Sequence, residues 1–411
     1  MRRGLGKEKN SKELKQSDTM AENEEITYPY EFDEERRKKA KLYSKQKFFT
    51  GIIQTFGLYL PFLAITYFSG FTSSLESWIR ELASGTFLSH HWIITAIFIL
   101  IYSILLYVIS LPISYYSGFL LEHKYDLSND TIWDWSKDQI KSLLISLIFM
   151  VPITLALFFL GYSFPDLWWL YAGILFFVIS GILSNISHLI ILPLFYDMEE
   201  LEDEELKERL TDMSEKHGVA KLKKVVVVKA SEKTEKANAG FAGMGKTKRL
   251  LLFDTLLDKF HPKEIEGVVA HELGHYVNKD VIRYVLINAG VIFPIFYLTG
   301  RMFTAYGSFG NIYYLPLFLL ILYGLYSLID PLTNAYSRYR EKKADRFAIE
   351  TTGEPQAMIS GFKRLSDIDL AELDPHKLIE IFFYDHPAPK KRIDRAKNFS
   401  KVKENKNKKD K

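Results

Sequence analysis

The chain contains no cysteine among its 411 residues. Disulfide bonds and zinc sites built from thiolates are therefore excluded, and any metal site must use histidine, aspartate or glutamate side chains. The net charge is also small, at +3, although charged residues make up 25% of the chain. No signal peptide is expected, because the first apolar run begins only near Phe48.

The charged residues are strongly segregated along the chain. They crowd into the two ends and one central block, and long apolar runs lie between them. About 20 apolar residues are needed for a helix to cross a bilayer. Six spans are predicted, at about 48–71, 92–121, 142–161, 167–192, 283–303 and 312–332.

The distribution of lysine and arginine predicts how these spans are oriented. The loops after the second, fourth and sixth spans carry nearly all of the basic residues, and the loops after the other spans carry almost none. Basic loops stay in the cytosol, so both ends and the central block are expected there. The basic residues are thus explained by the orientation of the spans in the membrane, and nucleic acid is not an expected partner. We expect the cell membrane for a prokaryotic chain, which we favour, and the endoplasmic reticulum membrane for a eukaryotic one.

The run Pro262–Val277 is predicted to be one helix that carries two histidines. Proline suits the first helical position, and apolar residues recur at helical spacing. His271 and His275 are four residues apart, so both imidazoles project from one face. This spacing is typical of two ligands to one zinc ion, with Glu272 as general base. Gly274 costs about 1 kcal/mol relative to alanine inside a helix, so we expect another element to approach it closely.

A catalytic zinc ion takes three protein ligands and keeps one position open for water. Glu341, in a charged helical run at 336–350, is the predicted third ligand, which gives one zinc ion per chain. Asp345 lies four residues later and faces the same way, so it is expected to accept the second N–H of a ligand histidine. Glu272 is expected to take a proton from the zinc-activated water and to deliver it to the leaving amine of a peptide.

Two other interpretations stay open. A non-enzymatic membrane protein, such as a transporter or scaffold, with a structural zinc site would need no base at Glu272. A protease with its zinc inside the bilayer would need the histidine helix to be a span. The second is disfavoured by the charged residues around the motif, which are Lys259, Lys263, Glu264, Glu266 and Lys279.

Several further elements are predicted around these motifs. Residues 34–47 are expected to form a helix on the membrane surface, and the polar tail that ends in a lysine-rich run is expected to be disordered. The central block is predicted to contain a helix at 201–216, strands at 225–228 and 249–253, and a turn at 237–248. Four polar residues inside the spans are candidates for either function or local pairing, namely Asn185, His188, Asn288 and Asp330.

The fold class is therefore a six-span α-helical membrane protein with a cytosolic α+β zinc-peptidase domain assembled from two segments. Residues 1–47 form a cytosolic N-terminal segment, partly disordered, and 48–197 contain four spans. Residues 198–280 form the catalytic segment with the histidine motif, and 281–332 contain spans five and six. Residues 333–411 contain the third-ligand segment and the basic tail.

These motifs resemble the type-1 CAAX prenyl protease family, which are integral membrane zinc endopeptidases of the gluzincin kind. The resemblance covers about residues 43–399. Six spans are predicted here, whereas the family commonly has seven. The matching segments are Leu111–Glu122, Leu192–Phe195, Asn238-Ala239, Lys248–Leu257, the HELGH motif, Asn334 through Asp345, and Tyr384–Pro387 with Arg392.

The resemblance implies roles that the residues alone do not establish. It implies His386 as a donor to the oxyanion or substrate, with Arg392 supporting it. It also implies that the segment Asn238, Ala239 and Gly240 is an edge strand along which the substrate lies. The implied substrates are membrane-associated peptides or proteins, with or without a prenyl group, including misfolded membrane proteins. The oligomeric state stays open.

Overall fold

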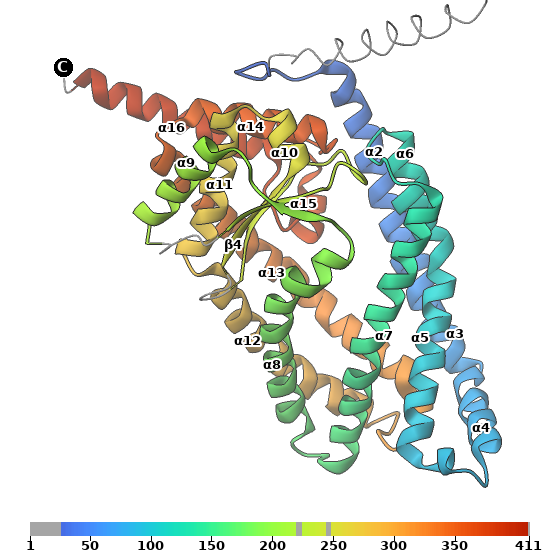
Figure 1. The fold of residues 1–411 in the computed structure, drawn as a ribbon. Helices are drawn as coiled ribbons and strands as arrows, with labels where there is room; N and C mark the ends of the chain where they lie inside the picture. Colours follow the sequence, from blue (N-terminus) through green and yellow to red (C-terminus); the bar gives the residue numbers. More distant parts are fainter. Residues whose placement is uncertain (1–25, 219–223, 244–247, 410–411) are drawn as a thin grey trace, which may run out of the picture.

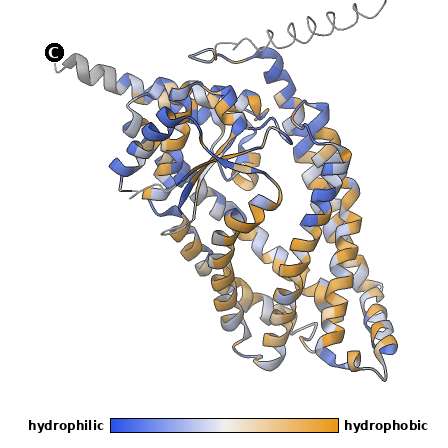
Figure 2. Cartoon of the chain, viewed as in Figure 1, coloured by the Kyte–Doolittle hydropathy of each residue, from blue (hydrophilic) through white to orange (hydrophobic). Residues whose placement is uncertain are grey.

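The computed structural model describes residues 26–218, 224–243 and 248–409. Long helices gather at one end of the molecule, and shorter helices around a small sheet gather at the other (Figure 1). Figure 2 separates the same two regions by hydropathy, because the long helices are largely apolar and the other end is largely polar. The N-terminal part that the sequence predicts to be disordered, residues 1–25, lies outside the described residues.

Within the described residues, five helices are long and apolar enough to cross a bilayer, and a helix pair bent by 42° makes a sixth span if it counts as one. This agrees with the six predicted spans. The α-helices of this region are α2 (Glu34–Ile52), α3 (Leu60–Phe68), α5 (His91–Tyr115), α6 (Leu121–Lys124), α7 (Ile132–Ser163), α8 (Trp168–Ile186), α12 (Asp280–Phe303) and α13 (Leu315–Thr352). An amphipathic helix, α4 (Phe71–Ala83), lies at the end of the bundle far from the sheet (Figure 1).

The prediction of a separate surface helix at 34–47 is wrong. These residues form the start of α2, which continues through a π-helical turn into α3 as one helix from Glu34 to Phe68. Buried polar contacts explain why the charged part does not lie flat. The hydroxyl of Tyr43 donates to Glu122 at the end of α6 at 2.8 Å, and Lys47 pairs with the same carboxylate at 2.6 Å.

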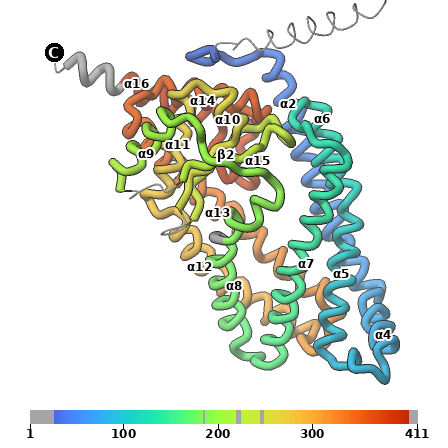
Figure 3. The backbone as a smooth tube through the Cα atoms, in the orientation of Figure 1, coloured from blue at the N-terminus to red at the C-terminus, as the bar shows by residue number. Residues whose placement is uncertain are grey.

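The predicted sixth span and the predicted charged helix at 336–350 are also a single helix, α13, of 38 residues. The apolar character ends near Leu332, but the helical backbone does not. Figure 3 shows the chain running from the bundle into the sheet-containing end along α13. Glu341 is therefore carried rigidly from the membrane helices into the other half of the molecule.

The candidate polar residues inside the spans have mixed environments. His188 is buried, in the π-helical turn Ser187–Ile191 at the bend after α8. Asn288 on α12 is exposed, and Asp330 on α13 is half-buried. The side chain of Asn185 lies outside the described residues.

The sheet has four strands in the order β1-β2-β4-β3. The predicted strands β2 (Val225–Val228) and β4 (Arg249–Phe253) are confirmed; they pair in parallel at the centre. β1 (Met198–Glu200) and β3 (Ala239–Ala242) are the antiparallel edges. The predicted turn at 237–248 is wrong for β3, because backbone pairing with β4 overrides the low strand propensity of alanine and glycine. Residues 244–247 of that turn lie outside the described residues.

Among the described residues, six helices accompany the sheet. They are α9 (Glu204–Lys216), α10 (Asp254–Lys259), α11 (Pro262–Val277), α14 (Pro355–Ile368), α15 (Lys377–Phe383) and α16 (Pro389–Lys409). The predicted helix α11 is confirmed, with Pro262 in its first turn and a capping box between His261 and Glu264. α10 was not predicted.

The prediction of a disordered tail is wrong for the part that forms α14, α15 and the first turns of α16. The charged residues of α14 are paired inside the fold and are not solvated. Arg364 donates to Glu264 of α11 at 2.8 Å, and Asp367 is buried beside Arg37 of α2. Their partners lie far away in the sequence, so local polarity gave a false indication of disorder.

The expected close approach at Gly274 is present. A Cβ atom added there would lie 3.1 Å from Cδ1 of Phe347 and 3.2 Å from the backbone Cα of Ala344. α11 and α13 therefore touch backbone to backbone, one turn from the residues that face each other across the site.

We expect Gly274→Ala to lower the thermal stability of the protein in detergent. Overpacking costs roughly 1–3 kcal/mol, which outweighs the gain of roughly 1 kcal/mol that alanine brings to a helix. Gly290→Ala on α12 is the matched control, because a Cβ there meets nothing within 4 Å. Equal melting temperatures for the two variants would contradict the close contact.

Candidate active site

The two histidines of α11 meet at their ring nitrogens. His271 is buried and His275 is half-buried, and their Nε2 atoms lie 3.2 Å apart. The capping box at the start of α11 satisfies its first N–H groups. The regular helix that follows projects His271 and His275 from the same face.

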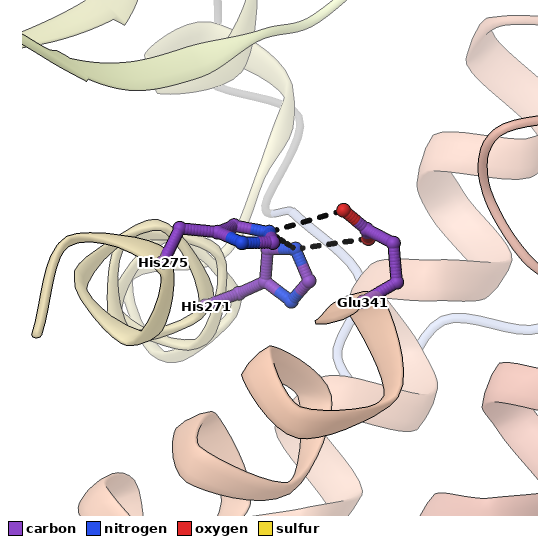
Figure 4. A group of neighbouring side chains, drawn as sticks. All are labelled: His271, His275 and Glu341. Carbon is purple, nitrogen blue, oxygen red and sulfur yellow. Dashed lines mark hydrogen bonds and ion pairs between the residues drawn. The ribbon is translucent and has the colours of Figure 1, made fainter. Parts of the chain in front are cut away.

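Glu341 faces the histidines from α13 (Figure 4). Its Oε2 atom is 3.3 Å from Nε2 of His271, and its Oε1 atom is 3.0 Å from Nε2 of His275. One ligand atom from each of the three residues lies within 4.8 Å of the other two. The predicted set His271, His275 and Glu341 is thus brought together.

The chemistry of this donor set fits a divalent cation. The Nδ1 atoms of His271 and His275 lie 3.1 Å from Asp345 and 2.9 Å from Asp280, respectively. If each Nδ1 carries the proton that its aspartate accepts, both Nε2 lone pairs point at each other and at the Glu341 carboxylate. Only a positive charge between them resolves that arrangement, and two imidazoles with one carboxylate are typical zinc ligands.

The pKa values of the site point the same way. Burial alone would lower the pKa of His275, but its hydrogen bonds to Asp280 and Glu341 outweigh burial and raise the pKa to about 10. Burial would raise the pKa of Glu341, but the hydrogen bonds and charges of the two histidines hold it well below its usual range. The cluster attracts protons when no other cation is bound, and a metal ion would replace them.

Asp345 and Arg392 form the support for His271. Arg392 donates from Nε to both oxygens of Asp345 at 3.1 Å, and its Nη2 atom lies 3.2 Å from Nδ1 of His271. Burial would raise the pKa of Asp345, but the charge of Arg392 and the hydrogen bond from His271 lower it to about 2. The resemblance implies that Arg392 supports His386, whereas these contacts join it to Asp345 and His271.

The corresponding support for His275 was not predicted from the sequence. Asp280 begins α12 and is 2% exposed, and Lys279 before it adopts a left-handed backbone (φ 54°) that ends α11 and turns the chain. Arg340, which is 1% exposed, donates from Nε to Asp280 at 2.7 Å. An acidic residue just after the motif, together with an arginine next to the third ligand, was the signal that could have revealed this pair.

Glu272 faces a small cavity beside the metal-ligand cluster. The cavity has a volume of about 190 Å³, and its lining includes His271, Glu272, Asn238 and Ala239. β3 presents one side to β4 and leaves its other side open at the edge of the sheet. A Cβ at Gly240 would meet nothing within 4 Å, so the face of the sheet is open at this residue.

His386 also lines this cavity. Its Nε2 atom is 3.4 Å from Oε1 of Glu341, and its Nδ1 atom is 2.9 Å from Asp385. The hydrogen bond with Asp385 raises the pKa of His386 above its ordinary value. Its side chain is half exposed, so it is available to a bound molecule.

Comparison with known proteins agrees with this architecture. Residues 200–400 match the model of peptidase family M48, and residues 20–197 match that of the CAAX prenyl protease N-terminal region with five membrane helices. The chain is 32% identical over 371 residues to the uncharacterized metalloprotease YhfN of Bacillus subtilis, covering 87% of this chain and 84% of that protein. The chain belongs to the type-1 CAAX prenyl protease family.

Two further relatives extend the match within this family. CAAX prenyl protease 1 of Saccharomyces cerevisiae is 29% identical over 323 residues, covering 72% of this chain and 71% of that protein. The crystal structure of S. mikatae Ste24p aligns with a TM-score of 0.77 and 26% identity over 88% of each chain. The protein is thus a multi-span membrane zinc metalloprotease, and the alternative of a non-enzymatic transporter or scaffold is not supported. Among the described residues, α11 is not one of the helices that are long and apolar enough to span a bilayer, as the zinc-in-bilayer alternative requires.

We expect Asp280→Asn to weaken zinc binding by roughly 10–100-fold, as is typical when the partner of a ligand histidine is changed. Glu341→Ala, which removes a ligand atom, should lose most of the metal. Competition with a chelator measures both. Asp385→Asn is the matched control, because it makes the same change beside a histidine outside the cluster. If Asp280→Asn binds zinc as tightly as Asp385→Asn, Asp280 does not support His275.

Proposed function

We propose that this protein is an endopeptidase in which His271, His275 and Glu341 hold one zinc ion per chain and Glu272 is the general base. The observation that carries the proposal is the convergence of these three ligand atoms beside a cavity that is lined by His271, Glu272 and residues of the edge strand β3. A structural zinc site needs neither a neighbouring base nor a cavity for a ligand.

The residues of the chain divide the reaction between them. A bound zinc ion supplies a Lewis acid and lowers the pKa of its water to about 7. Glu272 accepts the proton of the attacking water and returns it to the leaving amine. His386 donates a hydrogen bond to the oxygen that becomes negative in the transition state. Asp345 with Arg392, and Asp280 with Arg340, hold the two ligand histidines in one orientation.

The substrate lies along the edge strand formed by Ala239 and Gly240, next to Asn238. An extended peptide pairs with an open strand edge through main-chain hydrogen bonds, and that mode leaves sequence selection to the side-chain pockets. The relatives named CAAX prenyl protease 1 support a prenylated C-terminus as substrate, and a membrane-bound site also suits misfolded membrane proteins.

We expect Glu272→Gln to slow peptide cleavage by at least roughly 10²–10⁴-fold, the usual loss when a general acid–base is removed. Glutamine keeps the size of the side chain but cannot take a proton, so zinc content should not change. His386→Ala should slow cleavage by roughly 10²–10³-fold and also keep the metal. A quenched fluorescent peptide gives the rates.

The decisive contradiction is a zinc-loaded Glu272→Gln protein that retains full activity. Paired assays with a farnesylated and a plain peptide of the same sequence separate the two substrate classes. Equal kcat/KM for both would favour misfolded membrane proteins over prenylated substrates.

We further propose that the active site faces the cytosol, in the cell membrane of a prokaryote. Gly85, after α4, and Gly307, between α12 and α13, lie in the loops that follow the first and the fifth predicted spans. Reporter tags at these two glycines should be reached only from outside the cell, and tags at either terminus only from the cytosol. A C-terminal tag that is reached from outside would refute the proposed topology.

A further inference from the structure

Helix α15 connects the membrane helices to the loop of His386. On one side, the ring of Phe383 packs edge-on against Phe48 of α2 with their centroids 5.2 Å apart. On the other side, Asn334 of α13 donates to the carbonyl oxygen of Phe382 at 3.0 Å. α15 therefore touches the first and the last membrane helix of the chain.

Both contacts lie where a membrane helix changes character. α2 is charged up to Lys47 and apolar from Phe48 onward, and α13 is apolar up to Leu332 and polar from Asn334 onward. Such a change marks the level at which a span leaves the hydrocarbon core. Two independent spans thus place α15 at the same level, the surface of the bilayer.

One face of α15 is apolar and open, although the opposite face is well packed. The side chains of Leu378, Phe382 and Phe383, which we call the α15 patch, are 58%, 49% and 54% exposed. Glu380 on the opposite face is buried and accepts from the backbone N–H of Ala388 at 3.2 Å. An exposed lysine, Lys377, stands at the start of the helix. Aromatic and apolar side chains beside a lysine are typical of a helix lying in a membrane interface.

We propose that the α15 patch inserts into bilayer lipid on the peptidase side of the membrane and that this anchor positions His386. The loop of His386 follows directly from α15 and is held at both ends, by a residue of α13 before His386 and by a residue of α15 after it. Arg338 of α13 donates to the carbonyl oxygen of Tyr384 at 2.5 Å before His386, and Glu380 holds Ala388 after it. A shift of α15 in the interface moves His386 relative to Glu341. This effect on catalysis rests on the proposed function, whereas the lipid contact does not.

The absence of cysteine makes the lipid contact directly measurable. A spin label on Phe382→Cys is unique in the chain and can be examined in phosphatidylcholine–phosphatidylglycerol vesicles. We expect collisions with oxygen, which concentrates in lipid, to exceed collisions with a water-soluble nickel chelate. A label on Glu208→Cys, an exposed position of α9, is the water-facing control. If the two labels show the same accessibility ratio, the anchor is refuted.

The positioning of His386 needs a second measurement. Phe382→Asp should lower kcat, by up to the roughly 10²–10³-fold expected for loss of an oxyanion donor, with KM and zinc content unchanged. Phe382→Trp, which keeps an interfacial aromatic ring, should restore kcat. An unchanged kcat in Phe382→Asp would overturn the link to His386. If the wild-type protein cleaves no peptide, the proposed function fails, and the spin label still decides whether α15 lies in lipid.

Discussion

The backbone contact between α11 and α13 at Gly274 is the constraint on which the rest of the structure depends. Glu341 and the two histidines can share a cation only if their helices pack closely, and a Cβ at Gly274 would lie only 3.1 Å from Phe347 and 3.2 Å from the backbone of Ala344. The close packing density of protein interiors makes a displacement of either helix costly to absorb elsewhere. Gly274 therefore sets the distance between the two halves of the site, although it touches neither substrate nor metal.

The second constraint is electrostatic. The site buries several carboxylates, and each of them needs a positively charged or hydrogen-bonding partner. Asp280, Asp345 and Glu341 are all buried. Arg340 and Arg392 each pair with one of the aspartates, and the histidines lie between those aspartates and Glu341. Burial of a charge costs free energy unless it is paired and hydrogen-bonded. The two arginines thus stabilise the aspartates, and Glu341 lies against the two histidines, with Nη2 of Arg392 3.7 Å from its Oε2 atom.

The limits of sequence analysis follow from where the deciding interactions lie. α11 and β2 were predictable, because periodicity and β-branched residues are local signals. Local signals missed β3 as a strand, because its hydrogen bonds come from β4 and alanine and glycine have low strand propensity; only the family resemblance indicated an edge strand at Asn238, Ala239 and Gly240. α14 was missed because Asp367 and Arg364 looked solvated, whereas their partners, Arg37 and Glu264, come from α2 and α11. The role of Asp280 beside His275 was not predicted, because Asp280 is the first residue of a membrane helix and nothing local links it to the histidine.

The site cannot be divided into a soluble part and an anchor. The histidines precede the membrane hairpin of α12 and α13, and Glu341 follows it, on the same helix that crosses the membrane. The supporting contacts also join residues from before and after this hairpin. His271 contacts Asp345 of α13, and Asp280 at the start of α12 pairs with Arg340 of α13. The three ligand atoms can therefore meet only after the hairpin has formed. Insertion of these two helices into the bilayer is, in this architecture, a step in building the catalytic centre.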